Sequence, residues 1–413
     1  MRLTILAAAV FGLFLALAVL LPLYYGGADT DRIWTDEEIR RMQNLRLSDY
    51  GVAAKNVSNE LLYNRDAIEL GERLFSDVGL SASGRVACAT CHQPEYGYQD
   101  VNLATFRLDP SAPHRAPGLL GAALQDWFFW DGRADSLWSQ SLASIENPSE
   151  HATSRLQAVK HMCAQYASAF PALLAPCRQV DLTNTPLHAS PLTAKENWRK
   201  LSAAQQEGIN KLFVKLGKSI AAFEAGLMPA TSRFDLYVDA IATKNYARAA
   251  TILNEKETAG LKLFLDAKVG CINCHYGAMF SNSGFFAIGS DDPNKPMRDR
   301  LNGVKLLLDS EFNCLNWNAP ENCPKTLYVK QEGADLKGAY KTPSLRNLRY
   351  ARAFMHDGRY KTLEEVIEHY QNPNILPPRH IDIRPAGLLP HQRKQLLSFL
   401  NTLGEEAPSE EIK

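Results

Sequence analysis

The sequence predicts a mainly α-helical protein in which two related domains follow one another. The segments "AIELGERLF", from Ala67, and "EKETAGLKLFLDA", from Glu255, each place apolar residues on one face of a helix. Strand signals are sparse along the rest of the chain. A length of 413 residues suffices for two or three domains of ordinary size. We therefore expect helices at corresponding places in two halves of the chain.

A gapless self-alignment strengthens the prediction of an internal duplication. The segment "APGLLGAALQDWFFWDGRADSL" begins at Ala116, and "TPSLRNLRYARAFMHDGRYKTL" begins at Thr342. The alignment places Pro117 opposite Pro343 and one Asp-Gly-Arg triplet opposite the other. Chance rarely gives so long a shared register, so the two halves are expected to share an ancestor and a fold.

The alignment and the composition divide the chain into four stretches. Residues 1–28 contain "TILAAAVFGLFLALAVLLPLYY", an uncharged run that is long enough to cross a bilayer. They are interpreted as a signal peptide or an N-terminal membrane anchor, and both interpretations predict export. Residues 29–60 are polar and are interpreted as a linker. The N-terminal domain is expected over 61–235 and the C-terminal domain over 236–405.

The charges of the chain are balanced. Lysine plus arginine and aspartate plus glutamate both total 45, so the formal net charge is zero. Domains that bind nucleic acids usually carry a clustered basic excess. The composition shows no such excess, and we expect no nucleic-acid partner.

Four of the eight cysteines lie in two insertions, which are expected at 155–205 and 290–335. They are Cys163, Cys177, Cys314 and Cys323. In an oxidising compartment, local disulfides between the first two and between the last two are the natural expectation. Sequence alone does not fix this connectivity, and four free buried thiols are the alternative.

The other four cysteines belong to two C-x-x-C-H motifs, one in each half. "CATCH" contributes Cys88, Cys91 and His92, and "CINCH" contributes Cys271, Cys274 and His275. This pattern is the attachment signature of c-type haem, in which the thiols bond to the porphyrin and the histidine supplies an axial nitrogen to the iron. We therefore expect two cytochrome c-like domains, each with one covalently bound haem, in an exported, periplasmic protein.

Three other kinds of site contain two cysteines at this spacing. A thioredoxin-type dithiol needs a βαβ context, which the sequence does not predict. A zinc site would have to use adjacent Cys91 and His92, which are awkwardly placed for one tetrahedral ion. Plain disulfides leave the repeated histidine unexplained.

The self-alignment also predicts that the two haems differ on the side opposite the motif histidine. Tyr370, in the predicted helix "TLEEVIEHYQ", aligns with Ser144. A phenol can ligate ferric iron, whereas a serine hydroxyl rarely does. The C-terminal haem is therefore expected to be closed by His275 and Tyr370, and the haem on His92 to be open to a small ligand. The alternative is that Tyr370 is an ordinary amphipathic core residue.

With these motifs in their order, the chain resembles the bacterial dihaem cytochrome c peroxidase and MauG family from about residue 65 to 400. The resemblance rests on both C-x-x-C-H motifs and on "FFWDGRADSLWSQSL", "NPSEH", "YKTPSLRN" and "FMHDGRYKTLEEVIEHY". It implies that Trp130 relays electrons between the haems. It also implies that Gln140 and Glu150 lie above the peroxidatic N-terminal haem, where a carboxyl group can move a proton of peroxide. His356 matches a family histidine near the C-terminal haem.

Several residues depart from the usual pattern of these peroxidases. Tyr370 stands where they have methionine as an iron ligand, as in the MauG branch, and the rival candidate Met355 does not align with that position. His114 is the only histidine in "DVNLATFRLDPSAPHRAP", and we do not expect it to reach the iron. The first haem would then be open without prior reduction. Arg115 replaces an asparagine that helps to hold calcium between the domains, which leaves Ca²⁺ an open question.

The resemblance implies a peroxide-dependent oxidoreductase with two haems. Its electrons would come from a small redox protein, a cytochrome c or a cupredoxin, or from an aromatic side chain of a partner protein, as in the MauG branch. Anchoring to the inner membrane and a homodimer are further expectations that the sequence leaves open. The alternatives are a non-catalytic dihaem electron-transfer cytochrome and a haem-based sensor domain.

Overall fold

The computed structural model describes most of the chain. The described residues are 33–47, 58–105, 109, 112, 114–180, 191–290, 298–317, 323–373 and 380–404. The apolar run within residues 1–28 lies outside them, so the structure does not bear on its two interpretations. Within the described residues, no helix is both long and apolar enough to span a bilayer. The chain forms one unit over Met1–Met42 and a second, compact unit over Gln43–Lys413.

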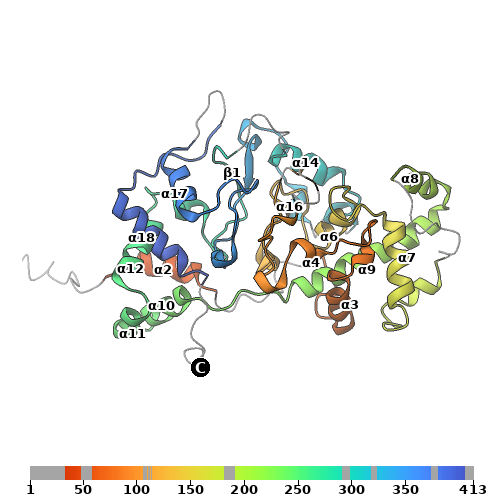
Figure 1. Cartoon of the computed structure of the whole chain (residues 1–413), viewed down its shortest axis with the longest axis horizontal. Coiled ribbons are helices and arrows are strands. Elements are labelled where there is room, and N and C mark those ends of the chain that lie inside the picture. The colour runs from red at the N-terminus through yellow and green to blue at the C-terminus, as the bar shows by residue number, and fades with distance from the viewer. Residues whose placement is uncertain are drawn as a thin grey trace, which may run out of the picture. The chain divides into compact units, whose positions relative to one another are not determined.

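The prediction of a mainly α-helical fold is confirmed (Figure 1). In the N-terminal half, α9 (Ala203–Glu224) packs against α3 (Arg65–Phe75), α6 (Leu137–Glu146) and α7 (Arg155–Tyr166). Their apolar faces form a buried core that includes Phe75, Trp138 and Ile220. Burial of such faces supplies most of the stability of helices in a folded protein.

The C-terminal half has its own helical pair. Helix α12 (Glu255–Leu265) packs against α18 (Pro390–Asn401), which also contacts α17 (Leu363–Gln371). Helices α10 (Arg233–Ala242) and α11 (Tyr246–Ile252) pack together, and the expected boundary between 235 and 236 falls inside α10. A cluster of aromatic rings fills this half, with centroid separations of 5.2–6.4 Å among Phe234, Phe264, Phe280 and Phe399.

A glycine allows close helix packing at the same place in each half. A Cβ at Gly71 of α3 would lie 2.0 Å from the carbonyl oxygen of Ser219 in α9. A Cβ at Gly260 of α12 would lie 2.0 Å from the carbonyl oxygen of Gln395 in α18. Any larger residue would clash with the facing backbone, so both helix pairs require glycine at the point of contact.

The remaining elements are two short strands, further helices and several 3₁₀ turns. Strand β1 (Phe285–Ala287) pairs antiparallel with β2 (Ala339–Lys341), with Phe286 opposite Tyr340. The other helices are α2 (Asp36–Leu45), α4 (Cys88–Cys91), α8 (Pro191–Lys200), α13 (Cys271–Cys274), α14 (Arg300–Asp309), α15 (Cys314–Trp317) and α16 (Pro324–Leu327). The 3₁₀ turns are η2 (Val78–Leu80), η3 (Pro94–Tyr96), η4 (Ala122–Leu124), η5 (Ala175–Arg178), η7 (Ala334–Leu336) and η8 (Leu348–Tyr350).

The two segments that align in sequence have the same local structure. Each runs from a 3₁₀ turn, η4 or η8, through an isolated antiparallel bridge and into a helix, α6 or α17. Phe128 pairs with Ala134 in the first segment, and Phe354 pairs with Tyr360 in the second. The predicted register between the two halves therefore describes backbone geometry as well as residue identity.

Both bridges contain a strained turn. Phe129 and Met355 have φ angles of 63° and 64°, and Gly132 and Gly358 have φ angles of 68° and 70°. Glycine adopts this region freely, whereas a bulky residue there costs about 1–3 kcal/mol. The strained residue directly precedes Trp130 in one half and His356 in the other, so both turns fix the direction of a large aromatic or imidazole side chain.

The second insertion packs across onto the N-terminal half. Asp135 accepts hydrogen bonds from the backbone N–H of Cys314 at 2.8 Å and from the hydroxyl of Thr326 at 2.7 Å. The ring of Phe312 lies 5.4 Å from that of Phe213 in the N-terminal core. The structure also contains the expected disulfides Cys163–Cys177 and Cys314–Cys323.

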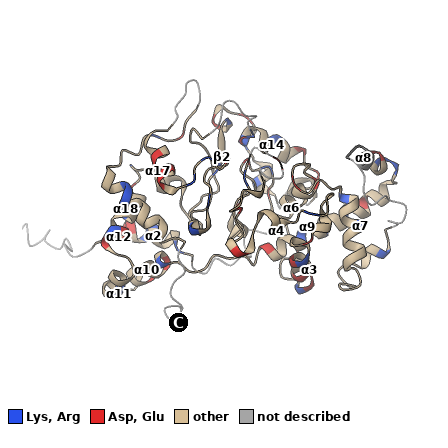
Figure 2. Ribbon diagram, viewed as in Figure 1, with Lys and Arg blue, Asp and Glu red and all other residues tan. Residues whose placement is uncertain are grey.

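The distribution of charge agrees with the balanced composition. Figure 2 shows acidic and basic residues interspersed along helices such as α3 and α12. Helix α3, for example, has an ion pair of 2.6 Å between Arg73 and Glu69 on its exposed side. Such pairs contribute little stability and mark ordinary solvated faces.

Candidate haem sites

The histidine of the C-terminal motif has the tautomer and the neutral charge that metal binding requires. Cys271 and Cys274 lie on α13, and His275 follows directly. The Nδ1 atom of His275 donates to the carbonyl of Phe280 at 2.8 Å, because a carbonyl can only accept. This bond fixes the tautomer and leaves Nε2 as the nitrogen able to bind a metal. Burial lowers the pKa of His275 to about 4, so the imidazole is neutral and able to bind a metal.

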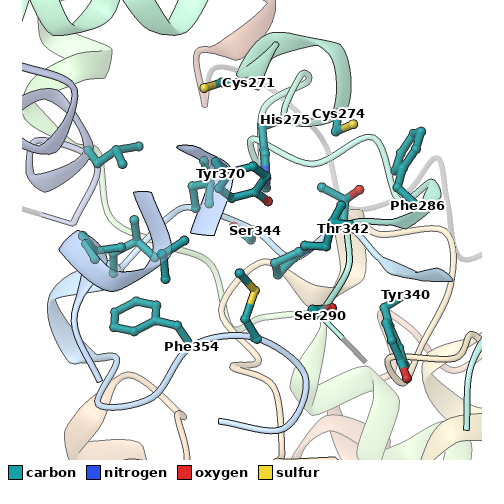
Figure 3. Close-up of a pocket in the computed structure, with 18 of the residues that line it drawn as sticks. Cys271, Cys274, His275, Phe286, Ser290, Tyr340, Thr342, Ser344, Phe354 and Tyr370 are labelled. Atoms are coloured by element: carbon teal, nitrogen blue, oxygen red, sulfur yellow. The ribbon is translucent and has the colours of Figure 1, made fainter. Parts of the chain in front are cut away.

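A cavity of about 460 Å³ lies in front of this motif. Figure 3 draws Cys271, Cys274, His275 and Tyr370 around it. Tyr370 comes from α17, and burial together with the nearby thiols raises its pKa above its ordinary value. The structure thus places the predicted phenol in the same cavity as the predicted histidine.

The N-terminal motif is similarly enclosed. Cys88 and Cys91 lie on α4, and burial lowers the pKa of His92, which keeps its imidazole neutral. The Nδ1 atom of His92 is buried and, among the described residues, has no hydrogen-bond partner. The Sγ atom of Cys88 lies 3.9 Å from Nε2 of His151, the residue after Glu150. The N-terminal motif therefore offers two thiols and a neutral imidazole, with His151 beside them.

The four motif thiols behave as structural or attachment cysteines. All four are free of disulfides. Burial raises the pKa of Cys91 and of Cys271 to about 12 and that of Cys274 to about 11, and it raises the pKa of Cys88 further. A redox dithiol needs the opposite shift. Within the described residues, no group of three or more His, Cys, Asp or Glu side chains is placed to hold a metal ion, so zinc gains no support.

The donor set fits a covalently bound haem in each half. Each site offers two free thiols and one neutral, half-buried motif imidazole, and the C-terminal site adds a cavity with a phenol on its wall. Apolar enclosure with a single imidazole donor is what c-type haem requires.

The residues expected to handle protons lie on and just after α6. Gln140 donates from Nε2 to the hydroxyl of Ser144 at 3.0 Å. Glu150 accepts from Nδ2 of Asn147 at 2.6 Å, and its Oε1 lies 4.0 Å from a guanidinium nitrogen of Arg133. The charge of Glu150 raises the pKa values of Cys88, Cys91 and His92. Glu150 therefore lies beside the N-terminal motif. Within the described residues, Gln140 and Glu150 do not hydrogen-bond each other.

Trp130 lies at the junction of the two halves. Its Nε1 donates to the carbonyl of Arg115 at 2.9 Å, and its ring centroid is 6.5 Å from that of His356. The backbone N–H of Lys341 donates to the carbonyl of Trp130 at 2.8 Å, and the N–H of Arg115 donates to the carbonyl of His356 at 2.9 Å. Arg115 and Lys341 align in the sequence repeat, so the two junction bonds are equivalent.

His114 belongs to an aromatic cluster at this junction. Its ring centroid lies 5.3 Å from that of His356 and 5.6 Å from that of Tyr340, and the last two rings stack at 3.8 Å. Burial and neighbouring positive charges hold the pKa of His114 well below its ordinary value. Met355 lines the C-terminal cavity, as do Trp130 and Tyr340.

Sequence reasoning missed one buried acid near the N-terminal motif. Glu224, at the end of α9, is 3% exposed, and burial raises its pKa to about 8. Of the charged side chains, Glu224 raises the pKa of Cys88 most. Its Oε2 has no hydrogen-bond partner among the described residues. The available signal was a lone carboxylate in the apolar run "SIAAFEAGL".

Comparison with solved structures supports the fold. The crystal structure of the diheme peroxidase BthA from Burkholderia thailandensis matches with a TM-score of 0.56 at 21% identity, over 82% of this chain and 86% of that one. The crystal structure of a MauG-like protein associated with microbial copper homeostasis matches with a TM-score of 0.53 at 22% identity, over 82% of this chain and 89% of that one.

Comparison of sequences points the same way. Residues 65–243 match the model of the di-haem cytochrome c peroxidase family. The methylamine utilization protein MauG of Methylorubrum extorquens is 28% identical, over 83% of this chain and 79% of its own length. The cytochrome c551 peroxidase of Nitrosomonas europaea is 26% identical, over 74% of this chain and 72% of its own length. The chain is thus similar to peroxidase-like enzymes, the di-haem cytochrome c peroxidases and MauG, and residues 65–243 carry the match to the family model.

Proposed function

We propose that the chain is a di-haem oxidoreductase that uses hydrogen peroxide as its oxidant without prior reduction. One observation carries the proposal. Tyr370 shares a cavity with His275, whereas Ser144, its counterpart in the other half, is engaged by Gln140 at 3.0 Å. One half therefore offers His275 and Tyr370 as a ligand pair, and the other offers the motif histidine His92 with His151 and polar groups nearby.

Each motif would hold one haem through two thioether bonds, in two domains related by duplication. Cys88, Cys91 and His92 serve the N-terminal haem, and Cys271, Cys274 and His275 serve the C-terminal haem. Tyr370 would hold the C-terminal haem together with His275. When bound, the haems supply the redox chemistry and the iron at which peroxide is reduced.

Gln140 and Glu150 would prepare peroxide for cleavage. The Gln140 amide can orient a bound oxygen while its Nε2 is held by Ser144. The Glu150 carboxylate can take a proton from one oxygen and return it to the departing one, which leaves as water. Arg133, 4.0 Å from this carboxylate, and Asn147 hold it in place beside the motif.

Trp130 would carry electrons between the halves, because it lies at their junction and is only 5% exposed. The electrons come from a small redox protein, a cytochrome c or a cupredoxin, or from an aromatic side chain of a partner protein. The names of the relatives include both a peroxidase and a MauG protein. A protein with two local disulfides and two haem-attachment motifs suits an exported, periplasmic location.

Stopped-flow mixing of the fully ferric protein with one equivalent of hydrogen peroxide tests the proposal. We expect absorbance changes from both haems before any reductant is added, followed by return to the ferric state when a reduced cytochrome or cupredoxin is supplied. A ferric protein that does not react, while its reduced form still passes electrons to such partners, would instead be a non-catalytic electron-transfer cytochrome.

A further inference from the structure

Arg115 is a half-buried cation that, among the described residues, has no direct carboxylate partner. Its Nε donates to the carbonyl of Met355 at 2.9 Å, and Nη1 donates to the carbonyl of Ala116 at 3.3 Å. Within the part of the chain that the structure describes, no carboxylate oxygen lies within ion-pair distance of this guanidinium. Burial lowers the pKa of Arg115 to about 10, while Asp100 and Asp357 oppose that shift from a distance. A charge that is costly to bury is therefore held by backbone carbonyls.

The same residue touches Trp130 in two ways. The guanidinium carbon lies 5.3 Å from the centroid of the Trp130 ring, and the Arg115 carbonyl accepts the indole N–H at 2.9 Å. The backbone N–H of Arg115 meanwhile bonds to His356 in the other half at 2.9 Å. One residue thus holds the indole by its face and its edge and ties it to the opposite half.

We propose that Arg115 is a positioning residue that fixes Trp130 at the junction of the two halves and keeps an oxidising equivalent from resting on it. This inference depends on the proposed role of Trp130 as a relay. When peroxide has oxidised the protein, one electron leaves the indole and one electron from the other half replaces it. The indole proton stays in place, because the Arg115 carbonyl accepts a hydrogen bond but is not a base.

The positive charge of Arg115 acts differently on the two states of the indole. A neutral indole is attracted to the guanidinium over its face. An indole that has lost an electron is positive, and the guanidinium repels it at this distance. The oxidised state is therefore short-lived, which protects Trp130 from irreversible oxidation and leaves the oxidising equivalents with the haems.

The equivalent residue in the other half, Lys341, shows what is specific to Arg115. Lys341 is buried, its backbone N–H bonds across the junction to Trp130, and its Nζ bonds to Gln125. Burial lowers its pKa to about 8. The Lys341 amine contacts the side-chain oxygen of Gln125 in the other half. Within the described residues, it does not lie over an aromatic ring. Only Arg115 combines the junction bond with a charge over the indole.

Two variants of the full-length holoprotein separate charge from geometry. Arg115→Gln keeps a hydrogen-bond donor and removes the charge, and Arg115→Lys keeps the charge and loses the planar fork. Arg349→Gln is the matched control, because Arg349 is exposed and lies 4.5 Å from the ring centroid of Tyr350. Haem absorbance and thermal unfolding establish that each variant is folded and loaded.

Two measurements are made on each variant. The first is the yield of tryptophan radical, by EPR after freezing with peroxide. We expect about a tenfold rise in Arg115→Gln, no rise in Arg115→Lys or Arg349→Gln, and loss of the new signal when Trp130→Phe is added. The second is hydrogen exchange of the Lys341 amide, which we expect to be about tenfold faster in both Arg115 variants, because neither Gln nor Lys has a donor at the position of Nε to hold the Met355 carbonyl.

Wild-type radical yield and exchange in Arg115→Gln would overturn the proposal. Faster exchange of the wild-type Lys341 amide after calcium chelation would also overturn it, since a bound cation would then hold the junction. If Arg115→Gln does not fold, Arg115→Lys decides through its exchange and radical yield. If Trp130→Phe leaves the reaction of both haems with peroxide unchanged, the relay role fails, but the exchange measurement still tests how Arg115 holds the junction.

Discussion

The two motif-bearing halves have the same frame and differ in what faces the motif histidine. Both halves have a glycine crossing, a strained bridge and a helix that begins at the aligned leucine. On that helix, Tyr370 lines the C-terminal cavity, whereas Ser144 accepts a hydrogen bond from Gln140. The comparison shows how one exchanged side chain on a shared frame can give two sites different chemistry.

The motif histidines differ too. The Nδ1 atom of His275 is fixed by the carbonyl of Phe280, whereas Nδ1 of His92 has no partner among the described residues. A histidine whose second nitrogen is hydrogen-bonded is a stronger and better-oriented ligand. The hydrogen bond to Phe280 therefore fixes the orientation of the C-terminal motif histidine.

The largest expected effect comes from removing the attachment thiols of one half at a time. Cys271→Ser with Cys274→Ser should halve the covalently bound haem, and so should Cys88→Ser with Cys91→Ser, because each pair serves its own site. Haem content per chain, measured after denaturation, checks this. Loss of all haem from either double variant would mean that the two sites are not independent.

The next largest effect is expected from removing the proton-transfer group of the N-terminal half, Glu150. Glu150→Gln should slow the reaction with peroxide by about 10²–10⁴-fold, because the amide cannot carry the proton. Exposed Glu95→Gln is the control and should react at the wild-type rate. Stopped-flow rates at saturating peroxide provide the measurement. A wild-type rate in Glu150→Gln would remove this residue from the mechanism.

A spectroscopic effect on one haem is expected from the phenol. Tyr370→Phe should change the absorption and EPR signals of the C-terminal haem only, because Ser144 and not a tyrosine stands in the other half. Ser144→Ala should leave the C-terminal signals unchanged. If Tyr370→Phe alters neither haem, the phenol is a core residue and the ligand assignment is wrong.

The smallest effect concerns the buried acid of the N-terminal half. The pKa of Glu224 is raised from 4.5 to about 8 by burial, so the folded protein binds the extra proton between these values. Its contribution to stability is therefore present below pH 4.5 and is lost as the pH rises towards 8. In Glu224→Gln, the difference in the free energy of unfolding between pH 5 and pH 8 should shrink by a few kcal/mol, the order of magnitude that the raised pKa implies. Thermal unfolding of the holoprotein at the two pH values measures this difference. An unchanged difference would show that Glu224 is ionised in the fold.

The sequence predicted the parts of these sites that depend on local pattern. Cys88, His92 and their C-terminal counterparts follow from a five-residue motif, and Tyr370 follows from the register between the halves. The disulfide pairs were predicted because their cysteines are close in the chain. Spacing carries this information directly, so no tertiary structure was needed.

The junction could not be predicted in the same way. Arg115 was noted only as a departure from the family pattern, because its contacts with Met355 and Trp130 join residues far apart in the chain. The packing of Phe312 from the second insertion onto the N-terminal core was missed for the same reason. The burial of Glu224 depends on how α9 meets the motif helix, which no local pattern encodes.

EPR of the ferric protein as isolated, with and without cyanide, tests most directly whether the N-terminal haem is open and the C-terminal haem is closed. We predict two haem signals in equal amounts, of which one shifts with cyanide and is the haem on His92, while the other changes only in Tyr370→Phe. Two haems that both resist cyanide would show that a protein side chain already occupies the N-terminal iron, and the account of an open site beside a closed one would be contradicted.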